Sequence, residues 1–134
     1  MMNFQTSVEL PVGLPPISHI SPILLMGSCF AENMGTFLTE AKFQLDLNPF
    51  GILYNPLSIS SALKEIITKK EYTEKDLFAY RGLWHSTMHH GSFSATTPEA
   101  TLQNINAGLL QPRQTVPMLD WLLMTFGTAY VYEA

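Results

Sequence analysis

The chain has 134 residues, which suits a single domain with a real hydrophobic core. Only 13% of the residues are charged and 46% are apolar, so we expect part of the surface to meet something other than water. A net charge of -4, with seven Lys and Arg in all, offers no basic stripe for phosphates and argues against a nucleic-acid partner.

Cysteine and histidine usage exclude other classes. Cys29 is the single cysteine, so an internal disulfide is excluded. No Cys/His cluster has zinc spacing, and we expect neither a metal nor another cofactor. The first residues lack a basic segment followed by a long apolar one, and no apolar run approaches the roughly 18 residues of a membrane span. We therefore expect a cytoplasmic protein with no secretory signal and no membrane span.

The chain divides into an arm and a domain. Residues 1–20 contain Pro11, Pro15 and Pro16, which predicts an extended N-terminal arm. Residues 21–134 carry the regular apolar patterns of a folded domain.

The first part of the domain predicts strand, helix and strand. Residues 22–27 form a continuous apolar run of the buried-strand type. From 29 to 41, apolar residues recur at intervals of three and four, which predicts a helix. Residues 43–47 alternate between apolar and polar, as a second strand does, and the loop Asn48-Pro49-Phe50-Gly51 follows.

Two further helices have recognisable starts. Asn55 is a plausible N-cap with Pro56 at the first helical position, and this helix ends near Lys69-Lys70. Thr97-Pro98-Glu99 begins the other helix in the same way.

The remaining segments lie between these helices and after them. Residues 71–79 predict a short helix capped by Thr73, 81–86 a strand and 85–97 a polar loop. Trp121–Phe126 reads as a buried strand that leads to Gly127-Thr128.

Alternating strands and helices predict an α/β fold with a parallel sheet and helices on both faces. Ligands of such sheets bind beyond the carboxyl ends of the strands. Three turns follow predicted strands, at Gly27-Ser28, Asn48–Gly51 and Gly127-Thr128, and we expect them to meet at one edge of the sheet. No helix follows the last strand to cover it, so the chain looks truncated.

Ser28 has two interpretations. A serine between a strand and a helix is exposed above a helix dipole, where several serine hydrolases keep their nucleophile. An ordinary N-cap serine takes the same position, although Ala31 stands where a capping box requires Glu or Gln. Cys29 is a rival nucleophile, but a lone cysteine is more often a small buried hydrophobe.

Other polar residues are also ambiguous. His85, His89 and His90 suit a structural or substrate-facing role first, a general base second and a metal site last. Asn48 either shapes the turn before Pro49 or donates to a substrate oxygen at the site rim. Phe50 suits the core or a pocket wall.

Four segments together resemble the N-terminal half of the GSCFA domain family. They are Gly27-Ser28-Cys29-Phe30-Ala31, Asn48-Pro49-Phe50-Gly51-Ile52-Leu53-Tyr54-Asn55-Pro56, His89-His90-Gly91-Ser92-Phe93 and Thr125-Phe126-Gly127-Thr128-Ala129-Tyr130-Val131-Tyr132. The family is similar to the SGNH, or GDSL-like, hydrolases. The resemblance implies a flavodoxin-like three-layer α/β/α sandwich with a serine nucleophile after the first strand.

By this resemblance Ser28 is the nucleophile, and the backbone N–H groups of Ser28 and Gly51 bind the oxyanion. His90 is the expected catalytic histidine within the chain, because it lies in a matching segment. Asn48, Phe50 and Thr128 are expected to border the substrate, a small-molecule or carbohydrate ester. SGNH enzymes usually carry Gly-x-Asn near Gly127, but Ala129 stands in the asparagine position.

Two functions follow from these observations. The first is an SGNH-like serine ester hydrolase or acyl-transfer domain, incomplete because the family's C-terminal Asp and His block has no match here. Without that histidine, Ser28 has no base to take its proton, and we expect the isolated chain to be inactive. The alternative is a non-catalytic interaction module that forms homo-oligomers through an exposed sheet edge.

Overall fold

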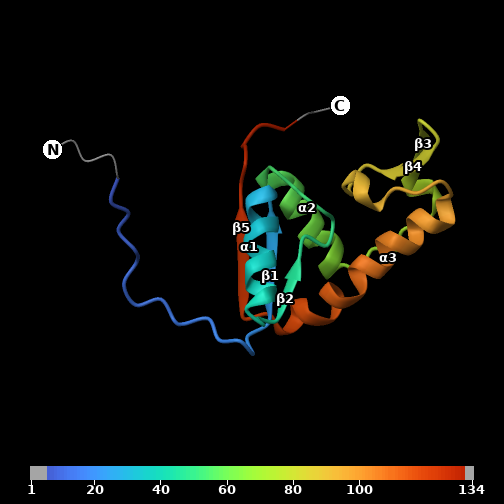
Figure 1. The fold of residues 1–134 in the computed structure, drawn as a ribbon. Helices are drawn as coiled ribbons and strands as arrows, with labels where there is room; N and C mark the ends of the chain where they lie inside the picture. Colours follow the sequence, from blue (N-terminus) through green and yellow to red (C-terminus); the bar gives the residue numbers. More distant parts are fainter. Residues whose placement is uncertain (1–5, 132–134) are drawn as a thin grey trace.

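The computed structural model describes residues 6–131, and its centre is a parallel three-stranded sheet. β1 (Ile23–Gly27) lies in the middle, with β2 (Leu45–Leu47) on one side and β5 (Trp121–Thr125) on the other. Figure 1 shows the three strands side by side. The prediction of a mixed α/β fold with a parallel sheet is confirmed.

Helices cover both faces of this sheet. Leu25 and Leu47 are register partners, and Leu47 packs on α1 (Cys29–Glu40), where a Cβ at Gly35 would come within 2.5 Å of it. Leu24 and Met26 instead belong to the core cluster that includes the buried residues of α2 (Pro56–Ile67). Because neighbouring residues of a strand point to opposite faces, α1 and α2 lie on opposite sides. The complete flavodoxin-like sandwich stays a prediction.

The third long helix extends the core away from the sheet. α3 (Pro98–Thr115) contributes Ile105 and Leu109 to the core cluster and leads through the 3-10 turn η3 (Val116–Met118) into β5. In Figure 1, α3 runs from the foot of the sheet to a separate hairpin.

That hairpin corrects one prediction, because residues 71–79 do not form a helix. A 3-10 turn, η1 (Glu74–Asp76), is followed by β3 (Leu77–Tyr80), which pairs antiparallel with β4 (Leu83–Ser86). Arg81 and Gly82 have φ values of 49° and 79°, the positive values of a tight hairpin turn. Thr73 does begin the turn, since its N–H donates to the Asp76 carboxylate at 2.9 Å. β4 falls within the strand predicted at 81–86.

Both predicted helix caps are confirmed. The Asn55 side chain accepts a hydrogen bond from the Ser58 N–H at 2.8 Å, and the Thr97 hydroxyl accepts one from Ala100 at 3.2 Å. Pro56 and Pro98 occupy the first helical positions, where a missing N–H costs nothing. The polar loop before α3 contains the 3-10 turn η2 (Gly91–Phe93).

Residues 6–20 contain no helix or strand and run away from the sheet (Figure 1). Within residues 6–131, every helix is too short or too polar to cross a membrane.

Candidate active site

The site begins at the junction of β1 and α1, where Ser28 is the N-cap. Its Oγ accepts a hydrogen bond from the Phe30 N–H at 3.3 Å, and the residue is only 8% exposed. The cap interpretation of Ser28 is therefore correct. It does not exclude a nucleophile, because the helix N-terminus that the hydroxyl caps also favours negative charge on its oxygen.

The end of β5 comes close to this junction. Gly27 has φ +147°, and a Cβ there would lie 2.2 Å from the Thr125 carbonyl oxygen, so only glycine fits. The Ser28 N–H donates to Thr125 Oγ1 at 3.2 Å, and the two hydroxyl oxygens are also 3.2 Å apart. The sequence interpretation missed Thr125. Its signal is the register, which pairs it with Gly27.

Asn48 joins the turn after β2 to the same junction. It is 6% exposed, has φ +41°, and accepts a hydrogen bond from the Gly27 N–H at 2.9 Å. Its side-chain amide donates to the Glu32 carboxylate at 2.7 Å. These contacts favour the turn-shaping interpretation, and they add Glu32, in the first turn of α1, to the site.

Gly51 and His90 are in direct contact. A Cβ at Gly51, whose φ is +80°, would lie 2.3 Å from His90 Cβ. The Gly51 N–H donates to the Asn48 carbonyl at 2.7 Å, so in this structure it belongs to the turn. His90 is exposed, and its Nδ1 accepts from the Ser92 N–H at 3.2 Å. Over residues 6–131 no histidine is hydrogen-bonded to Ser28.

The turn after β5 completes the site. The Tyr54 carbonyl accepts hydrogen bonds from the N–H groups of Gly127 at 2.8 Å and Thr128 at 3.0 Å. The neighbouring Leu53 N–H donates to the Gly27 carbonyl at 2.9 Å. The structure thus brings the three post-strand turns together.

Phe50 and His89 lie in the core. Phe50 is fully buried and stacks on the His89 ring with centroids 4.5 Å apart, so in this structure it has no surface for a substrate. His89 Nδ1 pairs with the Ser86 hydroxyl at 3.0 Å. Burial, and to a smaller extent the positive charge of Lys70, lower the pKa of His89 to about 4. Its imidazole is therefore neutral at pH 7.

The predicted histidine group is divided among separate places. His85 pairs through Nδ1 with the Ser94 hydroxyl at 2.8 Å, His89 is buried and His90 faces solvent. In the described part of the chain, no three His, Cys, Asp or Glu residues are grouped so as to hold a metal ion.

The model of the GSCFA family matches residues 22–134. The chain belongs to the GSCFA family. No curated protein and no solved structure matches it.

The structure explains most residues of the motif Gly27-Ser28-Cys29-Phe30-Ala31 in this GSCFA chain. Gly27 permits the close approach of β5, and Ser28 caps the helix. Cys29 is exposed at the first helical position. Ala31 is fully buried, so a larger side chain would not fit there.

Proposed function

We propose that this GSCFA chain carries part of an SGNH-like active site for serine ester hydrolysis or acyl transfer, with Ser28 as the nucleophile. One observation carries the proposal: a serine hydroxyl lies at a helix N-terminus where three turns from the carboxyl ends of parallel strands meet. A complete flavodoxin-like sandwich around this sheet is part of the proposal.

In the proposed reaction, Ser28 Oγ attacks the acyl carbonyl carbon while its proton passes to a general base. The tetrahedral intermediate collapses, the alcohol leaves with a proton from that base, and Ser28 carries the acyl group. Water then releases the acid, or a second alcohol accepts the acyl group. The α1 dipole favours the negative charge that develops beside Ser28.

The backbone amides of Ser28 and Gly51 are the proposed oxyanion donors. Each already has a partner in this structure: the Ser28 N–H donates to Thr125 Oγ1 at 3.2 Å, and the Gly51 N–H donates to the Asn48 carbonyl at 2.7 Å. Binding the oxyanion requires each N–H to exchange that partner for the substrate oxygen. The longer bond at Ser28 is the easier one to exchange.

Among residues 6–131, no general base is hydrogen-bonded to the Ser28 hydroxyl. We propose that it comes from a C-terminal Asp and His block of the SGNH type. His90 is the alternative within the chain, and it must leave Ser92 and turn toward Ser28. Asn48 and Thr128 border the proposed substrate, for which a carbohydrate or small-molecule acyl ester suits the chemistry.

The second candidate function is self-association without catalysis. One observation favours it: among the described strands, β5 pairs only with β1, and its other edge is open. Open strand edges readily pair with another chain.

Hydrolysis of p-nitrophenyl acetate tests the catalytic proposal. It is measured for this chain and for a version that also carries the family's Asp and His block. We expect Ser28→Ala to lower the Ser28-dependent rate about a thousandfold or more in the longer version. Cys29→Ala, the matched control at the next position, retains the rate. Equal rates for Ser28→Ala and the parent would refute the nucleophile.

A further inference from the structure

Asn48 ties the turn after β2 to the residue before Ser28. Its Oδ1 accepts a hydrogen bond from the Gly27 N–H at 2.9 Å, and its carbonyl accepts one from the Gly51 N–H at 2.7 Å. The backbone amides of Ser28 and Gly51 are the proposed oxyanion donors. Asn48 is therefore bonded to one donor and to the glycine that precedes the other, so it fixes how the two are placed relative to each other.

Gly27 needs such a restraint because glycine has more backbone freedom than any other residue. The Leu53 N–H donates to its carbonyl at 2.9 Å, and its own N–H donates to Asn48. The peptide unit that carries the Ser28 N–H begins at the Gly27 carbonyl. These two hydrogen bonds therefore hold the orientation of the Ser28 amide.

Glu32 determines which way the Asn48 amide faces. The amide oxygen accepts, the amide nitrogen donates, and a half-turn of the group exchanges the two. The Gly27 N–H can only donate, and an ionised carboxylate can only accept, so the two partners admit one orientation. Asn48 is 6% exposed, and its amide nitrogen donates to Glu32 Oε2 at 2.7 Å.

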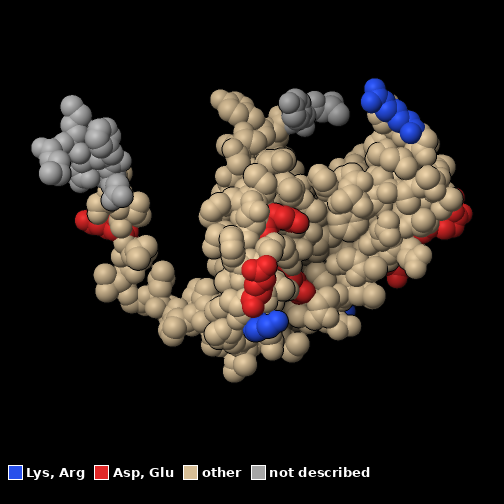
Figure 2. Space-filling model, viewed as in Figure 1, with Lys and Arg blue, Asp and Glu red and all other residues tan. Residues whose placement is uncertain are grey.

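No cation competes for the Glu32 carboxylate. Among residues 6–131, the ion pairs all belong to Lys70. On the face drawn in Figure 2, the charged side chains around α1 are mostly acidic. The Glu32 N–H also donates to the Ser28 carbonyl at 3.2 Å. Glu32 is thus connected to Ser28 through its backbone and to Asn48 through its side chain.

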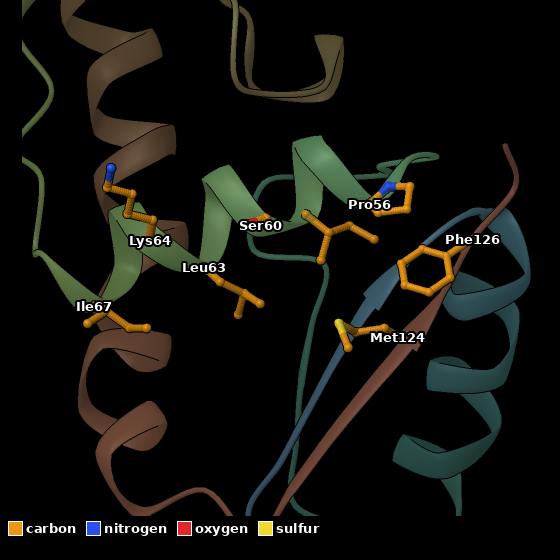
Figure 3. A pocket seen from close by; sticks show the side chains of 8 residues that line it. Pro56, Ser60, Leu63, Lys64, Ile67, Met124 and Phe126 are labelled. Atoms are coloured by element: carbon orange, nitrogen blue, oxygen red, sulfur yellow. The ribbon is translucent and has the colours of Figure 1, made fainter. Parts of the chain in front are cut away.

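These contacts are separate from the groove of about 490 Å³ between α2 and β5. The walls of that groove in Figure 3 come from α2 and from Met124 and Phe126, and they include neither Glu32 nor Asn48. Substitutions at these two positions leave the walls unchanged, so their effect on a reaction at Ser28 passes through the junction of β1 and α1.

We propose that Glu32 is a positioning residue, which orients the Asn48 amide so that the amide holds Gly27 and the following Ser28 N–H in place. The inference deepens the proposed function and rests on it. Glu32 touches no reacting atom. Without its carboxylate the amide is free to turn, and the two oxyanion donors no longer converge on one point.

Steady-state hydrolysis of p-nitrophenyl acetate tests this role in the version that also carries a C-terminal Asp and His block. We expect Glu32→Ala to lower kcat about tenfold with KM nearly unchanged, because the oxyanion donors act in the transition state. Glu40→Ala, the same substitution at the other end of α1, retains kcat. Thr97→Ala, which removes the cap of α3 and lowers stability, retains the kcat of the folded protein.

An exchange of the two side chains gives a sharper test. Asn48→Asp suits the φ of +41° and keeps an acceptor for the Gly27 N–H, but it sets two carboxylates against each other. We expect it to lower kcat about thirtyfold or more. Adding Glu32→Gln lets the new amide at position 32 donate to the new carboxylate at position 48. We expect this double variant to return to within about threefold of the parent kcat.

The failure of this role and the failure of the proposed function give different results. A parent without a Ser28-dependent rate refutes the proposed function, and the positioning role falls with it. A parent with such a rate overturns the positioning role alone if Glu32→Ala retains kcat. The same conclusion follows if the double variant stays as slow as Asn48→Asp.

Discussion

Ser28 is the N-cap of α1 in the structure and the nucleophile in our proposal, two interpretations that the sequence presents as alternatives. It caps α1 through the Phe30 N–H, and its hydroxyl lies 3.2 Å from that of Thr125. A capping hydroxyl already points at the positive end of the helix, where an oxyanion is stabilised. The cap therefore orients the oxygen that the proposed reaction uses, and what remains to be supplied is a base.

His89 makes the stability of the fold depend on pH. Its folded-state pKa is about 4, against an ordinary value of 6.5, so the unfolded chain takes up the proton first as the pH falls. We expect the free energy of unfolding to fall by about 2–3 kcal/mol between pH 6.5 and pH 4 on this account. Urea titrations at pH 7 and pH 4.5 measure the change.

His89→Gln provides the comparison for this pH dependence. Glutamine has no proton to gain, so the variant loses less stability than the parent over the same interval. Asp76 also makes the free energy of unfolding fall at low pH, because the Thr73 N–H holds the pKa of its carboxyl below the ordinary value. That contribution is present in both proteins and cancels. Equal losses in parent and variant would contradict the assignment.

Sequence reasoning reached some residues of the site and missed others. Gly27 ends β1, and Ser28, Asn48 and Thr128 follow strands, so the parallel topology alone predicts that they meet. Thr125 was missed because it lies inside a strand, and only the register with β1 reveals its contact with Ser28. Phe50 was interpreted both as a core or pocket-wall residue and as a substrate contact, and its ring is fully buried in the core against His89.

At the scale of elements, the start of α2 depends on Asn55. Its side chain accepts from the Ser58 N–H at 2.8 Å, which satisfies one of the free donors of the first turn. We expect Asn55→Ala to lower the free energy of unfolding by about 1 kcal/mol. Gln103→Ala, at an exposed site on α3, should change it by less than about 0.5 kcal/mol. Urea unfolding of the two variants checks this, and equal losses would contradict the cap.

Helices with both a cap and a proline at the first position were predicted with their starts, as α2 and α3 show. The hairpin was not predicted, although Thr73 does begin a turn, the 3-10 turn η1. A cap marks where a turn begins but not how far it continues, and here the turn ends after η1. The better signal was Arg81-Gly82, since Gly tolerates the positive φ of a hairpin turn.

At the scale of the whole molecule, Phe50 connects the core beneath the sheet to the segment that follows the hairpin. It belongs to the same cluster as Leu24 and Met26 of β1, and it stacks on His89, which follows β4 in the sequence. We expect Phe50→Leu to cost about 1–2 kcal/mol of unfolding free energy, because the smaller side chain leaves space at this contact. Phe37→Leu, at a residue 66% exposed, is the matched control and should be nearly neutral. A similar midpoint for both variants in urea would contradict this role.

The proposal for the whole molecule is that the turns after β1, β2 and β5 form part of a serine active site. Mass spectrometry after reaction with a fluorophosphonate tests it most directly, in a version that also carries the proposed C-terminal Asp and His block. We predict a covalent adduct on Ser28 that disappears in Ser28→Ala and persists in Cys29→Ala. An adduct on Cys29, or none in the peptide that contains both residues, would contradict the proposal.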